Sequence, residues 1–273
     1  MRSKLRQYWD ASAQWFGMLA MMVATGCVSG QNVYPGSLGE MITPLMPKSP
    51  GQIARDARDG LVNNDPDKIR RSIALLSSAS WGGEEAYLAL YRLVSQYPDD
   101  TVQTTGIRAL GRHGTPDDVP LIVIKLKRGA DYVRWEAARS LQRIHNPVAI
   151  NPLIATTKRV DEQVDVRLAA IGALGQYPKS EVFDALVGAL NDRHFAVRHS
   201  AQKSLKILTG QRFGPDTGTW LSWRKKNQDS LFKLGQTYVW QPYSKPPTFW
   251  DKAKFWKKRR SIPPRRPTGA ADL

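Results

Sequence analysis

Apolar residues in the middle of the chain recur with the spacing of one helix face, and the pattern itself repeats. Four similar segments begin at Val102, Val133, Val166 and Val197, which are 31, 33 and 31 residues apart. Each segment has apolar or small residues at its first, fifth, eighth and ninth positions, which form one face of an α-helix. The segments end on leucines with the same spacing, namely Leu110, Leu141, Leu174 and Leu205.

A second apolar segment follows each of the first three, at residues 119–124, 150–154 and 182–187. An earlier, less regular pair is expected at residues 66–76 and 84–97, with a capping helix over residues 52–63. A period near 30 residues with paired amphipathic helices indicates a repeat architecture, in which each unit buries its apolar face against its neighbours. The pattern predicts an all-α fold, an α-solenoid of about five helix pairs.

The shared motif, V-R-x-x-A-x-x-A-L, resembles HEAT repeats, in particular the short type also found in phycobilisome lyases. The resemblance extends over roughly residues 66–210. It implies that the arginines following the valines, Arg134, Arg167 and Arg198, join a ladder with carboxylates of adjoining turns. Asp131 and Asp165 are the candidate partners, and the role implied for these arginines is structural.

The end of the repeats is predicted to be covered by one more helix. A glycine-terminated helix is followed by Asp216, a favourable N-cap, and by Trp220 and Trp223, which lie one turn apart. This ending resembles that of many exported bacterial HEAT-repeat proteins. The two tryptophans are expected to cover the exposed apolar end of the last repeat, and the alternative is an aromatic ligand pocket.

The first residues have the order of a secretory signal: basic residues, then the apolar segment 16–24, then small residues. The apolar segment is about half the ~20 residues that a membrane-spanning helix requires. Ala24-Thr25-Gly26-Cys27 resembles a bacterial lipobox, although alanine replaces the preferred leucine. The resemblance implies cleavage after Gly26 and a diacylglyceryl group on Cys27. An ordinary cleaved signal and a cytosolic N-terminus with a buried cysteine are the alternatives.

Charge is unevenly distributed along the chain. The formal net charge is +16, and residues 223–273 hold thirteen Lys or Arg against three Asp or Glu. The tail, residues 233–273, is basic, aromatic and rich in proline, which predicts a largely disordered segment. Its candidate contacts with anionic lipid or another polyanion are Phe249, Trp250, Trp256, Lys257, Lys258, Arg259 and Arg260. A solvated tail with no partner is the third interpretation.

Basic residues also end the second helices of two repeats, at Lys125, Lys127, Arg128, Lys158 and Arg159. They could make one rim of the solenoid basic, and favourable placement at helix C-termini explains them equally well.

Catalytic and metal-binding motifs are not found. The sequence has no phosphate-binding loop, no G-x-G-x-x-G, no H-E-x-x-H and no G-x-S-x-G, and its single cysteine excludes a cysteine-based zinc site. We therefore expect no enzyme, no cofactor and no metal.

The domain organisation follows from these patterns. It comprises a lipoprotein-type signal peptide (1–26), a Pro/Gly-rich tether (27–51), the solenoid with its end caps (52–232) and the tail (233–273). The predicted function is that of an exported, lipid-anchored scaffold in the cell envelope, facing the periplasm or exterior and binding an unidentified protein partner. Alternatives are a nucleic-acid-binding protein similar to DNA glycosylases, should the signal be absent, and a bilin-lyase-like enzyme.

Overall fold

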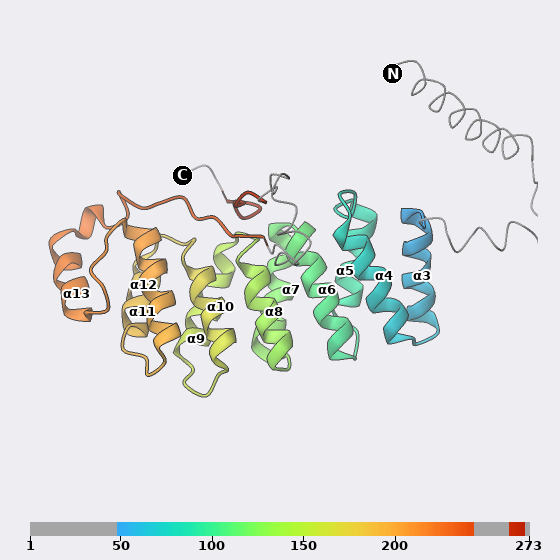
Figure 1. Cartoon of the computed structure of the whole chain (residues 1–273), viewed down its shortest axis with the longest axis horizontal. Coiled ribbons are helices and arrows are strands. Elements are labelled where there is room, and N and C mark those ends of the chain that lie inside the picture. The colour runs from blue at the N-terminus through green and yellow to red at the C-terminus, as the bar shows by residue number, and fades with distance from the viewer. Residues whose placement is uncertain (1–47, 243–261, 271–273) are drawn as a thin grey trace, which may run out of the picture. The chain divides into compact units, whose positions relative to one another are not determined.

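The structure is a computed structural model that describes residues 48–242 and 262–270. The chain divides into two units, Met1–Lys48 and Ser49–Leu273, and nearly all described residues belong to the second. This unit is all-helical over its described residues (Figure 1). Its helices are α3 (Pro50–Val62), α4 (Pro66–Ser78), α5 (Glu85–Val94), α6 (Asp100–His113), α7 (Val119–Arg128), α8 (Asp131–Leu141), α9 (Ile150–Lys158), α10 (Val164–Leu174), α11 (Ser180–Ala189), α12 (Phe195–Thr209) and α13 (Thr217–Lys226).

The helices form two layers, which confirms the predicted α-solenoid. Helices α4, α6, α8, α10 and α12 pack side by side in sequence order, and we call them the signature layer because four of them carry the repeated motif. Helices α5, α7, α9 and α11 form the companion layer. Each packs against the signature helix that follows it in sequence, and α9 also contacts α7 and α11. Helix α3 covers α4 at one end, and α13 packs on α11 at the other.

Short polar side chains fix where several helices begin. Ser49 and Gln52 form a reciprocal capping box, and Asp65, Asp99 and Asp216 accept hydrogen bonds from backbone N–H groups at the starts of α4, α6 and α13. These bonds satisfy donors that have no partner inside the helix. Helix α3 begins at Pro50, so the predicted tether of residues 27–51 overlaps the first helix, where proline is well tolerated.

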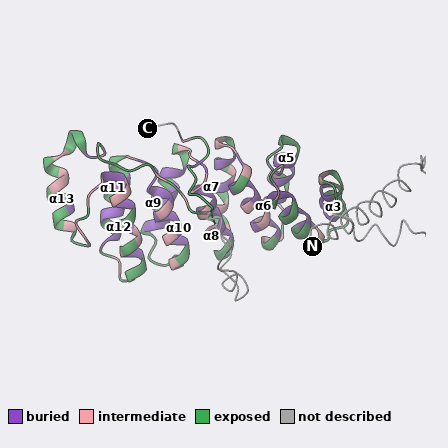
Figure 2. Cartoon of the chain, turned by 45° about the horizontal axis from the view of Figure 1, so that its top comes forward, coloured by how far each residue is buried: buried purple, intermediate pink, exposed green. Residues whose placement is uncertain are grey.

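The repeated valines and leucines form the core between the layers (Figure 2). Val102, Leu110, Val133, Leu141, Leu174, Val197 and Leu205 are fully buried, and Val166 is nearly so. Small residues bring neighbouring signature helices into close contact: Ser140 Oγ donates to Ile107 O at 3.1 Å, and Ser204 Oγ donates to Ile171 O at 2.9 Å. A Cβ atom on Gly111 would lie 2.3 Å from Ser140 Oγ, so this approach requires glycine.

Part of the tail, which was predicted to be largely disordered, lies within the described residues. Residues 233–242 and 262–270, which we call the strap, cross the ends of the helices from α12 towards α8 (Figure 1). Gln236 N donates to Ile207 O at 2.6 Å, and Thr268 exchanges backbone hydrogen bonds of 2.8 Å with Arg143 and His145. Backbone groups thus bind the strap to the repeats, which a composition-based prediction does not detect.

The two parts of the strap also pair with each other. Trp240 N donates to Arg265 O at 2.9 Å, and Arg265 N donates to Trp240 O at 3.0 Å.

Several predicted sites lie outside the described residues and stay predictions. They are the signal with Gly26 and Cys27, the tether up to residue 47, and Phe249, Trp250, Trp256, Lys257, Lys258, Arg259 and Arg260.

Candidate binding surface

An arginine follows three of the four repeated valines, and its contacts are with the fold itself. Arg134 donates to Glu162 Oε1 at 2.7 Å, to Asp131 Oδ1 at 2.8 Å and to the Gly129 carbonyl at 2.8 Å. The Glu162 carboxylate is fully buried. Asp131 was the expected partner, whereas Glu162 was not foreseen. Arg134 thereby joins the end of α7, the start of α8 and the turn before α10.

Arg167 makes equivalent contacts one repeat later, whereas Arg198, in the repeat after that, donates to backbone carbonyls instead of a carboxylate. Arg167 pairs with Asp192, rather than with the expected Asp165, and donates to Thr157 O at 3.3 Å. Arg198 donates to the Asp192 carbonyl at 2.8 Å. Burial opposes the charged form of the Asp192 carboxyl, but hydrogen bonds from the His194 backbone and from Arg167 lower its pKa to about 2. These arginines are occupied by the fold and are not available to a partner.

The two tryptophans predicted to cap the repeats do so with two phenylalanines. Trp220 is buried, and its ring centroid lies 4.9 Å from that of Phe213 and 6.1 Å from that of Phe183. Trp223 lies edge-on to Trp220, with ring centroids 6.4 Å apart. Trp220 Nε1 donates to Gly214 O at 2.9 Å, so the polar atom of this buried ring is also satisfied.

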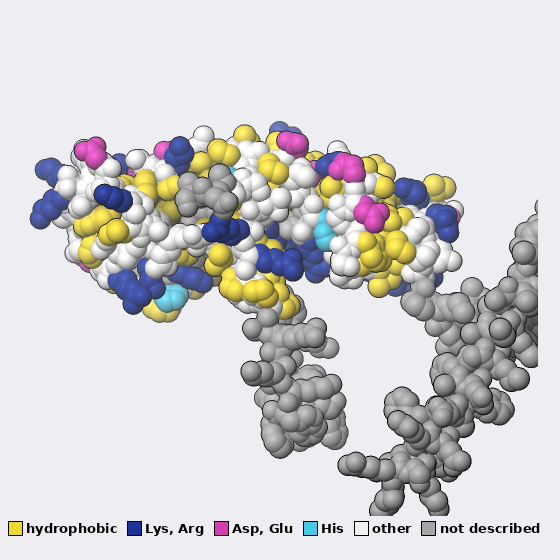
Figure 3. Space-filling view, turned by 90° about the horizontal axis from the view of Figure 1, so that it is seen from above, with side chains coloured by type: hydrophobic (Ala, Val, Ile, Leu, Met, Phe, Trp, Pro, Cys, Tyr) yellow, Lys and Arg dark blue, Asp and Glu magenta, His cyan; other side chains and the backbone are white. Residues whose placement is uncertain are grey.

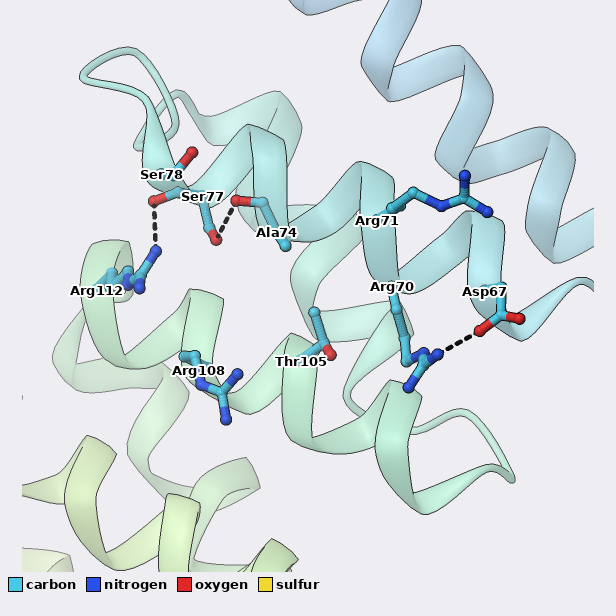
Figure 4. A pocket seen from close by; sticks show the side chains of 9 residues that line it. All are labelled: Asp67, Arg70, Arg71, Ala74, Ser77, Ser78, Thr105, Arg108 and Arg112. Atoms are coloured by element: carbon cyan, nitrogen blue, oxygen red, sulfur yellow. Dashed lines mark hydrogen bonds and ion pairs between the residues drawn. The ribbon is translucent and has the colours of Figure 1, made fainter. Parts of the chain in front are cut away.

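A different group of arginines lines one side of the signature layer. These residues, which we call the arginine surface, come from α4, α6 and α8 with the turn after it: Arg70, Arg71, Arg108, Arg112, Arg139 and Arg143. Between α4 and α6 lies a shallow cavity of about 470 Å³ lined by Arg70, Arg71, Arg108 and Arg112. Figure 4 shows Arg70 and Arg108 extending from facing helices into this space. A space-filling view shows Lys and Arg side chains gathered near the middle of the molecule (Figure 3).

Few acidic groups neutralise the arginine surface. Arg70 pairs with Asp67 on its own helix, and Arg108 donates through two nitrogens to Glu136 Oε2 at 3.0 and 2.9 Å. The Glu136 side chain is only 1% exposed, so this carboxylate is a buried countercharge. Arg112 reaches a backbone carbonyl, Ser77 O, at 3.4 Å. The surface therefore keeps a net positive charge.

Two tryptophans lie beside the last arginines of the surface. The Arg139 guanidinium carbon is 4.7 Å from the centroid of the Trp135 ring, and that of Arg143 is 5.1 Å from the centroid of Trp240 on the strap. Both distances are in the range of a cation–π interaction. The strap thus contributes an aromatic wall at the end of the arginine surface.

Arg143 is partly buried and interacts electrostatically with three other arginines. Burial is the largest effect on its guanidinium, and together with Arg139, Arg112 and Arg108 it outweighs the attraction of Glu136 and lowers the pKa of Arg143 to about 10. Burial and neighbouring Arg108 also lower the pKa of Arg112. The charged forms of these side chains are thus poorly compensated within the chain.

Hydrogen bonding is incomplete at the same place. Among the described residues, three buried side-chain polar atoms have no hydrogen-bond partner: Glu136 Oε1, Arg143 Nη1 and Trp240 Nε1. Buried polar atoms are almost always paired in folded proteins. All three of these exceptions belong to the region where the strap crosses α8.

Sequence reasoning missed this surface and placed the basic rim elsewhere. Of the residues proposed for that rim, Lys125 donates to Gln103 Oε1 at 3.0 Å, and Arg159 lies 3.4 Å from both Asp161 and Glu162. The repeat register contained the signal for the arginine surface. Arg108 and Arg139 are 31 residues apart, as are Arg112 and Arg143, the same interval as Val102 and Val133.

The described residues lack two other kinds of feature. No group of three or more His, Cys, Asp or Glu side chains is arranged to hold a metal ion. No helix in residues 48–242 has the length and apolar character needed to cross a membrane.

Comparison with known proteins identifies the repeats. A family model of HEAT repeats matches residues 57–142 and 119–206, which together make up more than half of the chain. The search of curated proteins found no match.

Proposed function

Since this chain belongs to the family of HEAT-repeat proteins, we propose that it is a non-catalytic scaffold that binds a partner protein along its signature layer. Stacked helical repeats offer extended surfaces of this kind. The observation that carries the proposal is the arginine surface, in which α4 and α6 line one cavity with arginines and Arg143 lies close enough to interact electrostatically with those of α6 and with Arg139. A partner with complementary acidic groups would be recognised there.

The proposed scaffold is exported and held at the membrane through a lipid on Cys27. This part of the proposal rests on the sequence order of basic residues, apolar segment and lipobox-like Ala24–Cys27. A single acyl anchor gives marginal attachment, and a second basic, aromatic contact makes it stable. Backbone pairing of Trp240 with Arg265 brings together the two ends of the strap that flank residues 243–261, which contain the candidate lipid-contacting residues.

The anchor is tested by replacing Cys27 with serine in the full chain expressed in its native host. We expect Cys27→Ser to abolish metabolic labelling with a fatty acid and to shift the protein from the membrane to the soluble fraction. Ser29→Ala, two residues further on, is the matched control and leaves both readouts unchanged. Unchanged labelling and fractionation of Cys27→Ser would exclude the lipid anchor.

Binding of nucleic acid is the second candidate function, and one observation favours it. Arginines stacked on Trp135 and Trp240 resemble the mixture of charge and aromatic rings that single-stranded nucleic acids bind. Salt-dependent retention of the chain on single-stranded DNA, with a loss on replacing Arg108 or Arg139 by glutamine, would support this function. Retention that survives both substitutions would remove the surface from consideration. No observation favours the bilin-lyase-like activity.

A further inference from the structure

The junction of α6, α8 and the strap contains more positive than negative charge. Four guanidinium groups, those of Arg108, Arg112, Arg139 and Arg143, interact electrostatically around the Glu136 carboxylate. Only Arg108 hydrogen-bonds to this carboxylate, and it uses Oε2 alone. Arg112 is exposed and the Arg108 side chain is 42% exposed, whereas Arg143 is partly buried, and a buried cation is normally neutralised by an anion.

The atoms without partners define what would complete this site. Arg143 Nη1 and Trp240 Nε1 are hydrogen-bond donors, and Glu136 Oε1 is an acceptor. These atoms are buried, so a ligand reaches them only where the strap moves away from α8, and it must then present acceptor oxygens to the two donors and a donor to Glu136. A polypeptide segment with acidic side chains does this, because its carboxylates accept and its backbone N–H groups donate.

We propose that this junction binds the side-chain carboxylates of an acidic polypeptide segment, with Arg112, Arg143 and Trp240 as the principal contacts. The inference rests on the proposed scaffold function and names the chemistry of the partner. Arginine is well suited to the role, since its planar fork forms two parallel hydrogen bonds to one carboxylate.

The length of the arginine surface is consistent with an extended peptide. Adjacent packed helices lie about 8–10 Å apart, and an extended chain rises about 3.3 Å per residue. An acidic residue at about every third position would therefore meet α4, α6 and α8 in turn. The arginines do not continue into the next repeat. There, Gly172 on α10 and Gln176 in the turn after it occupy the corresponding positions. A short segment of the partner is thus sufficient.

Nucleic acid fits the junction less well. A phosphodiester backbone brings acceptors but no donor for Glu136 Oε1. Trp135 already carries the Arg139 guanidinium at 4.7 Å from its ring centroid, so that face is not free to stack on a base.

The proposal is tested by fluorescence anisotropy of fluorescein-labelled hexaglutamate, titrated with the full-length protein in detergent. We expect saturable binding that Arg143→Gln and Arg112→Gln each weaken by about tenfold, the effect of losing one charge-assisted hydrogen bond. Arg128→Gln is the matched control, because it removes the same charge from an exposed position on α7. It should change the affinity by less than about twofold, as expected of screened surface charge.

A second pair of measurements separates loss of the site from loss of the fold. Trp240→Phe keeps an aromatic ring but removes the Nε1 donor, so it should weaken hexaglutamate binding severalfold at an unchanged melting temperature. Hexaglutamate should raise the melting temperature of the unmodified chain and not that of Arg143→Gln.

Three results would overturn the proposal: hexaglutamate binding that Arg143→Gln and Arg112→Gln leave intact, an equal loss in Arg128→Gln, or tighter binding of single-stranded DNA or phosphatidylglycerol vesicles with the same arginine dependence. These readouts do not depend on Cys27, so this site and the membrane-anchor part of the proposed function can fail separately. If purified partner protein bound to the signature layer while hexaglutamate did not, the scaffold would stand and the acidic-segment site would fall.

Discussion

The signature helices that begin at Val102 and Val133, α6 and α8, differ from the two that follow, α10 and α12, on the face that carries the arginine surface. The sixth position after the repeated valine is Arg108, Arg139, Gly172 and Lys203 in the four helices, and the tenth is Arg112, Arg143, Gln176 and Ile207. The core positions of the same helices are alike and buried throughout. One fold thus holds two kinds of surface.

The later repeats satisfy their polar groups internally. Gln176 Nε2 donates to Leu141 O at 2.7 Å, while its Oε1 lies 3.2 Å from His145 Nδ1. At the equivalent position one repeat earlier, Arg143 leaves Nη1 without a partner. This difference is the one expected if the α10–α12 region serves stability while the α6–α8 region binds the proposed ligand. Natural proteins commonly trade stability for function at such sites.

The largest effect on stability is expected at the C-terminal end of the solenoid, which α13 covers. Trp220→Ala removes a buried ring from a cluster with Phe183 and Phe213, so we expect a loss of about 3–5 kcal/mol in the free energy of unfolding. Trp240→Ala, at a partly exposed position on the strap, should cost about 1 kcal/mol. Urea denaturation followed by circular dichroism measures both. Equal losses would show that the strap, too, is essential for folding.

A smaller effect is expected when the carboxylate that pairs with Arg167 is protonated. The pKa of Asp192 is about 2 in the folded chain, below its ordinary value of 3.8. The charged carboxylate therefore stabilises the fold above about pH 4, and this contribution of about 2 kcal/mol is lost as the pH falls towards 2. Asp192→Asn should flatten the pH dependence of the urea midpoint over this interval. Asp229→Asn, at an exposed position, is the control and should leave the slope unaltered.

The smallest predicted effect is a gain of binding. Gly172→Arg places an arginine on α10 in register with Arg108 and Arg139, and the added Cβ meets only the flexible Gln142 side chain, whose Nε2 lies 3.0 Å away. We expect hexaglutamate to bind about threefold more tightly, the effect of one additional partly screened charge. Gly188→Arg adds the same charge to α11, where no atom lies within 4 Å of the new Cβ, and should not alter affinity.

Much of the fold could be predicted because its determinants are local and periodic. Predicted helices at 66–76 and 84–97 correspond to α4 and α5, which span Pro66–Ser78 and Glu85–Val94. Helix α13 could be predicted equally well, from its aspartate N-cap and its tryptophans. The strap could not be predicted, because its order depends on backbone hydrogen bonds to residues far away in the sequence, such as that of Thr268 to Arg143.

The net charge of residues 52–222 does not reveal the arginine surface. Over residues 52–222 the charges nearly balance, but the balance combines two populations. Acidic residues such as Glu162 and Asp192 pair with the structural arginines, which leaves Arg112 and Arg143 with few countercharges. Only the three-dimensional arrangement reveals this separation, although aligning the repeats would have shown the recurrence of Arg108 at Arg139.

The central claim is that structural and ligand-binding arginines occur in the same repeats. Helix α8 and the turn after it contain one arginine of each kind, so a pair of matched substitutions tests the claim. Arg134→Gln and Arg143→Gln remove the same charge, and equilibrium urea unfolding measures both. We predict that Arg134→Gln lowers the free energy of unfolding by about 3 kcal/mol, because it strands the buried Glu162 carboxylate. Arg143→Gln should leave the free energy unchanged or raise it by up to about 1 kcal/mol, because it removes an unpaired buried donor. A loss in Arg143→Gln as large as that in Arg134→Gln would contradict the account.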